Sequence, residues 1–198
     1  MTTWVERPSD RDGRPRGPVG LVRAWVAVLT GPRRFFRAAV SPGDQAPGLV
    51  FVVAVTAVAA GTRLAAVPAA RPVYGDRPLL SAVLAVSLVA LVLAPVYLHL
   101  VAAVQTLALV PFAPARAGVS ETVQVLAYAT APCVLAGAPV DWLTAVAAGY
   151  GAVLLFVGLS EVHGVSVGRA AALGAVPAAL VFGYAFGGFA AAARLVGV

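Results

Sequence analysis

Charged side chains are scarce in this sequence, and long parts of it have none. Only 11% of the 198 residues are charged, whereas soluble domains average about 25%. The uncharged parts are too many and too long for the single core of a soluble domain of this size to bury. The scarcity of charge therefore argues against an ordinary soluble fold. The uncharged stretches are Gln45–Thr62, Pro78–Ala115, Thr122–Val140, Trp142–Ser160 and Ala170–Ala193.

Lysine is absent, and cysteine occurs once. A single cysteine, Cys133, excludes an intrachain disulfide, and its apolar neighbours indicate a small packing residue. All 14 basic residues are arginines, and they give the chain a net charge of +6. They gather beside the uncharged stretches, where arginine orients a membrane protein and meets anionic lipid. We therefore expect the lipid bilayer, and no nucleic acid, as the partner of these charges.

The uncharged stretches predict an all-α polytopic membrane bundle. A bilayer core is crossed by roughly 20 apolar helical residues, and lipid offers no partner to an unpaired backbone group, so each crossing must be a helix. The stretch after residue 78 is long for one crossing and contains Pro95; one tilted, kinked span is favoured over two short re-entrant halves. The membrane domain covers 45–198, with five spans at about 48–68, 79–112, 120–138, 141–160 and 170–193.

Two segments precede this domain. Residues 1–17 are rich in proline, glycine and charge and lack the apolar core of a signal peptide, so we expect a disordered polar arm. Residues 18–44 combine aromatic side chains with arginines, which predicts an amphipathic helix at the headgroup level. The alternative is a helix packed on the cytoplasmic face of the bundle. The arginines expected to bind anionic headgroups are Arg23, Arg33, Arg34 and Arg37.

The distribution of arginine predicts the orientation. With five spans and a cytoplasmic N-terminus, ten arginines fall on the cytoplasmic side and four on the other side, as the positive-inside rule requires. The prediction is a multi-pass protein of the cell membrane with its C-terminus outside. The four outer arginines are Arg63, Arg71, Arg77 and Arg194.

No catalytic, cofactor or metal constellation is recognisable in the sequence. His99 is the one titratable residue deep in a span, and we expect it to donate to a backbone carbonyl, such as one left free near Pro95. Glu161 and His163 are two residues apart and do not share a helical face, which argues against a metal site. The sequence thus predicts a protein that is not an enzyme. A transporter or channel is the alternative, and would need mid-membrane polar groups facing one cavity: His99, Gln105, Thr106, Gln124 and Thr130.

Several short elements resemble the Yip-type (Ypt/Rab-GTPase-interacting protein) membrane domain family in its archaeal and bacterial form. The elements are a Gly-Pro-Arg-Arg-Phe-Phe-Arg segment, a Tyr-x-x-x-Pro element and a Gly-Leu-x-Glu-x-His-Gly element, spread over about 21–190. The resemblance implies five spans, and eukaryotic members bind prenylated small GTPases. The Asp-Leu-Tyr-Gly-Pro element of those members is missing, so the resemblance implies a fold without an activity. The motif residues are Pro32, Phe36, Thr122, Tyr128, Pro132, Gly158, Glu161, His163 and Gly164.

Physical roles for the shared residues can be proposed. Pro132 removes a backbone donor and should loosen the helix around Tyr128. Glu161 and His163 should meet Arg116 and Glu121 at the cytoplasmic face, in a polar cluster that clamps the bundle. The predicted function is a membrane scaffold or interaction protein that packs against itself, as a homo-oligomer, or against a membrane-protein partner through small residues.

Overall fold

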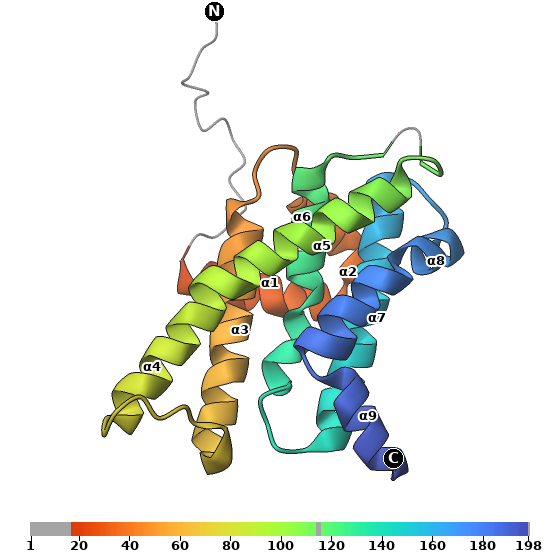
Figure 1. Cartoon of the computed structure of the whole chain (residues 1–198). Helices are drawn as coiled ribbons and strands as arrows, with labels where there is room; N and C mark the ends of the chain where they lie inside the picture. The colour runs from red at the N-terminus through yellow and green to blue at the C-terminus, as the bar shows by residue number, and fades with distance from the viewer. Residues whose placement is uncertain (1–16, 114–115, 198) are drawn as a thin grey trace, which may run out of the picture.

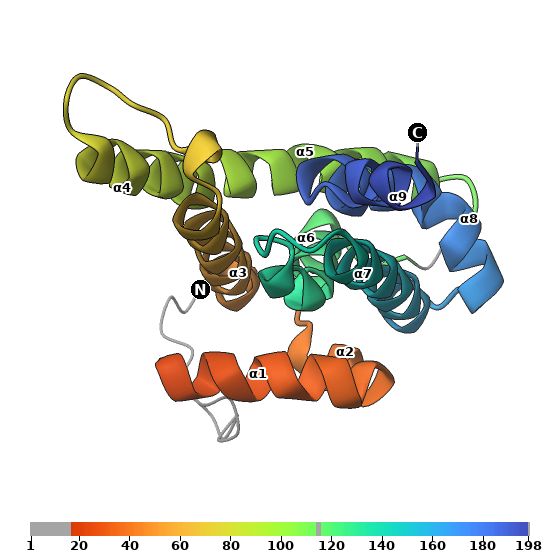
Figure 2. The same cartoon turned by 90° about the horizontal axis from the view of Figure 1, so that it is seen from below.

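The computed structural model describes residues 17–113 and 116–197, and every regular element in these ranges is a helix. Helices α3, α6 and α7 run along the long axis of the bundle, α5 and α8 pass across one face of it, and α1 crosses the opposite face (Figure 1). Seen from below, α6 and α7 lie between α5 and the α1–α2 pair (Figure 2). The all-α prediction is confirmed. The predicted arm at 1–17 lies almost wholly outside the described residues.

The N-terminal part consists of two short helices, α1 (Pro18–Thr30) and α2 (Pro32–Ala39). Each begins with a proline, whose missing N–H would be unpaired at the first helical position in any case. Gly31 separates them, and its N–H bonds back to the carbonyl of Ala27 at 2.9 Å. The first long helix, α3 (Ala46–Ala66), follows after a short connection.

A run of 32 helical residues, Pro78–Leu109, forms the second long helix. A π-helical segment precedes Pro95, because proline lacks an N–H and its ring would collide with the carbonyl of the preceding turn. His99 Nδ1 donates to the Pro95 carbonyl oxygen at 2.7 Å, the role expected for it. The run is one tilted helix rather than two re-entrant halves (Figure 1). Its parts are α4 (Pro78–Leu88), η2 (Val89–Leu93) and α5 (Ala94–Leu109).

The third apolar stretch is a broken element. α6 (Val119–Ala129) is an α-helix, and η3 (Ala131–Leu135) continues it as a 3-10 helix that contains Pro132. Every residue from Thr122 to Ala129 is buried, and α6 packs against α3, α5 and α7. Pro132 cannot donate to an α-helical ladder, which explains why the α-helix ends here and does not run on to residue 138.

The C-terminal part has one uninterrupted helix and one broken helix. α7 (Asp141–His163) ends at Gly164, which adopts the left-handed conformation with φ of 65°. A π-helical segment follows Pro177, whereas the one in the long helix precedes Pro95, and the left-handed Gly187 separates the later segment from the last helix. The broken elements are α8 (Val167–Ala178), η4 (Ala179–Ala185) and α9 (Gly188–Val196).

Four helices in the described part are long and apolar enough to cross a bilayer. Many of their large apolar side chains face outward, as expected of helices surrounded by lipid. The chain is therefore a multi-pass membrane protein with several membrane-spanning helices. The four helices are Ala46–Ala66, Pro78–Leu109, Asp141–His163 and Val167–Ala185.

Gln124 fastens the N-terminal segment to the centre of the bundle. Its side-chain Nε2 donates to the Ser41 carbonyl at 2.6 Å, and the Ser41 N–H donates to Gln124 Oε1 at 3.0 Å. Gln124 is 1% exposed, so it satisfies a buried stretch of backbone that has no helical partner. Gly48 of α3 allows this approach, since a Cβ there would lie 3.3 Å from the Gln124 Cα.

Two buried glutamines provide a matched test. Replacing Gln124 with Leu removes both hydrogen bonds between this side chain and the Ser41 backbone, and we expect a loss of about 1–3 kcal/mol of stability. Both amide atoms of the fully buried Gln105 lack a hydrogen-bond partner among the described residues. Replacing Gln105 with Leu should therefore leave stability unchanged or raise it. Thermal unfolding in detergent measures both, and equal losses would contradict this account.

Candidate functional site

Six of the predicted motif residues come together where α2 packs on α6 and α7. Phe36 comes from α2, Thr122 and Tyr128 from α6, and Gly158, Glu161 and His163 from the second half of α7. We call this set, together with Arg37, the α2–α6–α7 junction. The other three motif residues shape the backbone: Pro32 begins α2, Pro132 lies in η3, and Gly164 ends α7.

Aromatic packing forms the apolar part of the junction. Phe36 is 1% exposed, and its ring lies against Gly158. A Cβ on Gly158 would lie 2.9 Å from Phe36 Cζ and 2.7 Å from Val125 Cγ1, closer than real Cβ atoms approach. The Tyr128 ring sits edge-on between Phe35, at a centroid distance of 4.9 Å, and Phe51, at 5.2 Å. The absence of a side chain at Gly158 thus lets α2 press into the bundle.

Glu161 forms the charged part. Arg37 Nε donates to Glu161 Oε2 at 2.6 Å, and Arg33 Nη1 lies 3.5 Å from Oε1. The Glu161 side chain is only 10% exposed, whereas both arginines extend into the surroundings of the bundle. The hydrogen bond and the negative charge of Glu161 raise the pKa of the Arg37 guanidinium above its ordinary value. The carboxylate therefore binds α2 to α7.

The prediction that Glu161 meets Arg116 was wrong, whereas Arg116 lies near enough to His163 for its positive charge to act on the imidazole. Among the described residues the ion pairs of Glu161 are with Arg33 and Arg37, not with Arg116. The helix α2 packs along α7 and brings these arginines to Glu161, across a sequence separation of 124 residues for the Arg37 bond. No local pattern in the sequence encodes that approach.

Within the junction, His163 is buried and lies against Thr122 of α6. Its Nε2 lies 3.3 Å from Thr122 Oγ1, and the Thr122 hydroxyl itself donates to the Gly118 carbonyl at 3.0 Å. Because the threonine proton is already committed, we assign the Nε2–H tautomer, which donates to Thr122. The acceptor atom Nδ1 is buried and has no partner among the described residues. His163 therefore joins the end of α7 to the start of α6.

Sequence reasoning missed two aromatic contacts that hold α1. The Trp25 indole Nε1 donates to the carbonyl of Ala131 at 2.8 Å, at the point where α6 gives way to η3. The Tyr150 hydroxyl donates to the carbonyl of Leu29 at 2.5 Å, near the end of α1. Polar aromatic side chains in or beside apolar stretches are the signal, since their N–H and O–H groups need partners when buried.

Of the five polar groups considered for a transport path, four bond to backbone carbonyls, and Gln105 is buried without a hydrogen-bond partner among the described residues. His99 bonds to Pro95 and Thr130 to Ala127, each within its own helix or turn. Gln124 bonds to the Ser41 backbone. Residues 17–113 and 116–197 also contain no group of three His, Cys, Asp or Glu side chains that could hold a metal ion.

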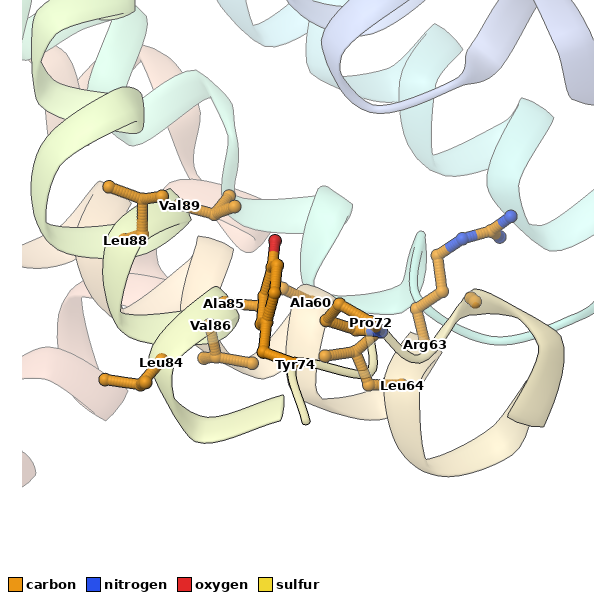
Figure 3. A pocket seen from close by; sticks show the side chains of 11 residues that line it. Ala60, Arg63, Leu64, Pro72, Tyr74, Leu84, Ala85, Val86, Leu88 and Val89 are labelled. Carbon is orange, nitrogen blue, oxygen red and sulfur yellow. The ribbon is translucent and has the colours of Figure 1, made fainter. Parts of the chain in front are cut away.

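A cavity of about 540 Å³ lies at the other end of the bundle, between α3 and the α4–η2 part of the long helix. Its walls are mostly apolar, and Tyr74 stands between them, whereas the guanidinium of Arg63 points away from the α4 wall (Figure 3). None of the predicted motif residues lines this cavity.

Two glycines of α7 test the packing of α2. Replacing Gly158 with Ala should cost about 1–3 kcal/mol, because the new methyl group overpacks the contact with Phe36 and Val125. Gly149 lies in the same helix, and a methyl group there would have no neighbouring atom within 4 Å; replacing Gly149 with Ala should stabilise the protein by about 0.5–1 kcal/mol. Unfolding in detergent, followed by tryptophan fluorescence, measures both. A Gly158→Ala variant as stable as the unmodified protein would contradict the proposed close packing of α2 against Gly158.

A double-mutant cycle tests the ion pair. Glu161→Gln and Arg37→Gln should each lower the unfolding midpoint, and the double variant should lose less than the sum, because the first change already removes the interaction. Arg34→Gln serves as the control, since Arg34 forms no ion pair within the described ranges. Additive effects of the Glu161 and Arg37 changes would show that the pair contributes nothing to stability.

Comparison with known protein families identifies the chain. A family model described as the Yip1 domain matches residues 26–189, which include the junction and the four helices of the described part that are long enough to cross a bilayer. Searches of curated proteins and of solved structures found no match. The predicted family is confirmed, and this membrane protein belongs to the Yip1 domain family.

Proposed function

We propose that the protein is a non-enzymatic membrane scaffold of the prokaryotic branch of its family, which presents a basic N-terminal segment to anionic lipid at the cytoplasmic face. The observation that carries the proposal is the Glu161 ion pair, because it fixes α2 to the bundle and leaves the charge of Arg34 exposed. A membrane-protein partner or a second copy would then dock on the same scaffold.

The proposal includes five crossings. The α6–η3 element has 11 α-helical and 5 3-10 residues, which add up to roughly 26 Å, close to the roughly 30 Å of a bilayer core. α5 ends and α6 begins at one end of the bundle, and η3 leads to the start of α7 at the other end (Figure 1). The 3-10 part rises more per residue than an α-helix, and this adds to the length with which the element crosses the bilayer core.

The orientation follows from the same alternation. α2, the start of α6 and the end of α7 share one end of the bundle, which carries Arg33, Arg34 and Arg37 beside Glu161. The positive-inside rule makes this end cytoplasmic. The N-terminus is then cytoplasmic and the C-terminus, at the opposite end in Figure 1, lies outside the cell.

The surface beside Glu161 suits a lipid headgroup. A shallow cavity of about 360 Å³ is lined by Gly31, Pro32, Arg33 and Arg34 of the α1–α2 corner and by Val157 of α7. Arginine binds phosphate with several N–H donors at once. Glu161 neutralises only part of the local positive charge, so the corner keeps a net attraction for anionic lipid.

Lipid enrichment tests this function. We expect the protein, reconstituted in phosphatidylcholine vesicles with a minor fraction of labelled phosphatidylglycerol, to gather the anionic lipid, as read by energy transfer from its tryptophans. Arg33→Gln with Arg34→Gln should reduce the transfer, and roughly 0.5 M salt should do the same by screening. Arg63→Gln with Arg77→Gln removes two charges from the opposite end and is the matched control.

If both double variants reduce the transfer equally, the enrichment reflects overall charge, and the proposed role of the N-terminal segment is wrong. If neither does, anionic lipid is not the ligand of this segment.

A further inference from the structure

α1 lies at a different level along the bundle from the headgroup level that its sequence predicts. α1 crosses the flank of the bundle part of the way down the length of α3 and α7, rather than at their ends (Figure 1). From below, it forms a separate layer on the side of α6 and α7 that faces away from α5 (Figure 2). A helix at the headgroup level would instead lie beside the ends of the spanning helices.

Two hydrogen bonds fix this level. The Tyr150 hydroxyl donates to the carbonyl of Leu29. Trp25 Nε1 donates to the carbonyl of Ala131, which belongs to η3 in the broken third element. Tyr150 precedes Glu161 by eleven residues on α7, which corresponds to about 16 Å of helix. Amphipathic helices that lie in the interface bury their apolar face by only roughly 5–10 Å. The end of α1 is therefore bonded to a residue of α7 that lies about three turns before Glu161, on the side away from the proposed headgroup level.

The face of α1 that the bundle does not cover is apolar. Val19, Val22 and Val26 are 61%, 59% and 46% exposed and follow one another at helical spacing. Leu21 and Trp25 lie against the core on the other side. A helix that is apolar on both its inner and its outer face is suited to hydrocarbon and not to water. The single charge on α1, Arg23, sits on a long side chain that can extend toward the interface.

Three carbonyls in the last turn of α1 are hydrogen-bonded within the protein, as a helix end in hydrocarbon requires. The Ala27 carbonyl accepts the Gly31 N–H, the Val26 carbonyl accepts the Thr30 hydroxyl at 2.8 Å, and the Leu29 carbonyl accepts Tyr150. Such pairing inside the protein is necessary where no water is available. At its other end, Pro18 removes one N–H that would otherwise be unpaired.

We infer that α1 is an in-plane helix buried among the acyl chains of the cytoplasmic leaflet, with α2 leading from it to the headgroups. The inference rests on the proposed membrane orientation. Its ligand is the hydrocarbon of one leaflet, contacted by Val19, Val22 and Val26. Because α1 has no counterpart of this kind in the opposite leaflet among the described helices, it widens the protein on the cytoplasmic side, and the protein favours membranes whose cytoplasmic leaflet is convex.

Spin labels measure the depth of α1. In a Cys133→Ala background, single cysteines replace Val22, Val26, Arg34 and, as the depth standard on a spanning helix, the exposed Val58 of α3. In phosphatidylcholine–phosphatidylglycerol vesicles, we expect the Val22 and Val26 labels to match Val58 in their high accessibility to oxygen and low accessibility to a water-soluble nickel complex. The Arg34 label should show the reverse.

The standard separates two kinds of failure. A Val58 label accessible to nickel would contradict the membrane embedding on which the proposed function rests. A deep Val58 label with Val22 and Val26 labels as shallow as Arg34 would overturn this inference alone. Oxygen-shielded Val22 and Val26 labels with spin–spin broadening would show that a second copy, and not lipid, covers α1, which also overturns it.

Curvature preference is read on membrane tubes pulled from giant vesicles. With its cytoplasmic side outward, the protein should be denser per lipid on the tube than on the flat membrane. Replacing Val19, Val22 and Val26 with Asn should reduce that enrichment, whereas the single Val58→Asn variant, on a spanning helix, should retain it. Equal density of the unmodified protein on the tube and on the flat membrane would contradict the inferred preference for a convex cytoplasmic leaflet.

Discussion

Hydrocarbon provides no hydrogen-bond partner for a peptide group, and the rest of this structure depends on that constraint. In the proposed five-crossing arrangement, it applies most strongly to the third apolar element, because Pro132 ends the α-helix of that element at mid-length. Its backbone can remain in the membrane only if other protein groups surround it. The long helices α3, α5 and α7 enclose α6, and Trp25 supplies a donor to the Ala131 carbonyl at the break.

The same constraint explains how the N-terminal segment is held. Its contacts with the bundle are polar and aimed at backbone or buried groups: Trp25 to Ala131, Tyr150 to Leu29, Gln124 to Ser41 and Arg37 to Glu161. Each of these bonds joins parts of the chain that are at least 83 residues apart. The segment is thus an integral layer of the domain, and the family match from residue 26 onward includes most of it. In the proposed function, this layer is the part of the domain that meets lipid, and its hydrogen bonds join it to η3, α6 and α7.

Much of the fold could be predicted from the sequence because its determinants are local. Apolar runs specify helices, Pro132 indicates a weakened helix in the third element, and His99 follows Pro95 by the four residues needed to bond its carbonyl. The partner of Glu161 could not be predicted, since an exposed arginine on α2 and one on a loop look alike in sequence. The level of α1 along the bundle could not be predicted either, because it depends on hydrogen bonds from Tyr150 and Trp25 to carbonyls that are far away in the sequence.

The central claim is that the broken α6–η3 element crosses the membrane, and labelling of single cysteines in sealed vesicles tests it most directly. In a Cys133→Ala background, a cysteine at Ala117 precedes α6 and one at Ala138 follows η3. The account predicts that a membrane-impermeant maleimide reaches Ala117→Cys only from the cytoplasmic side and Ala138→Cys only from the other side. Labelling of both positions from one side would show a re-entrant element and would contradict the five-crossing account.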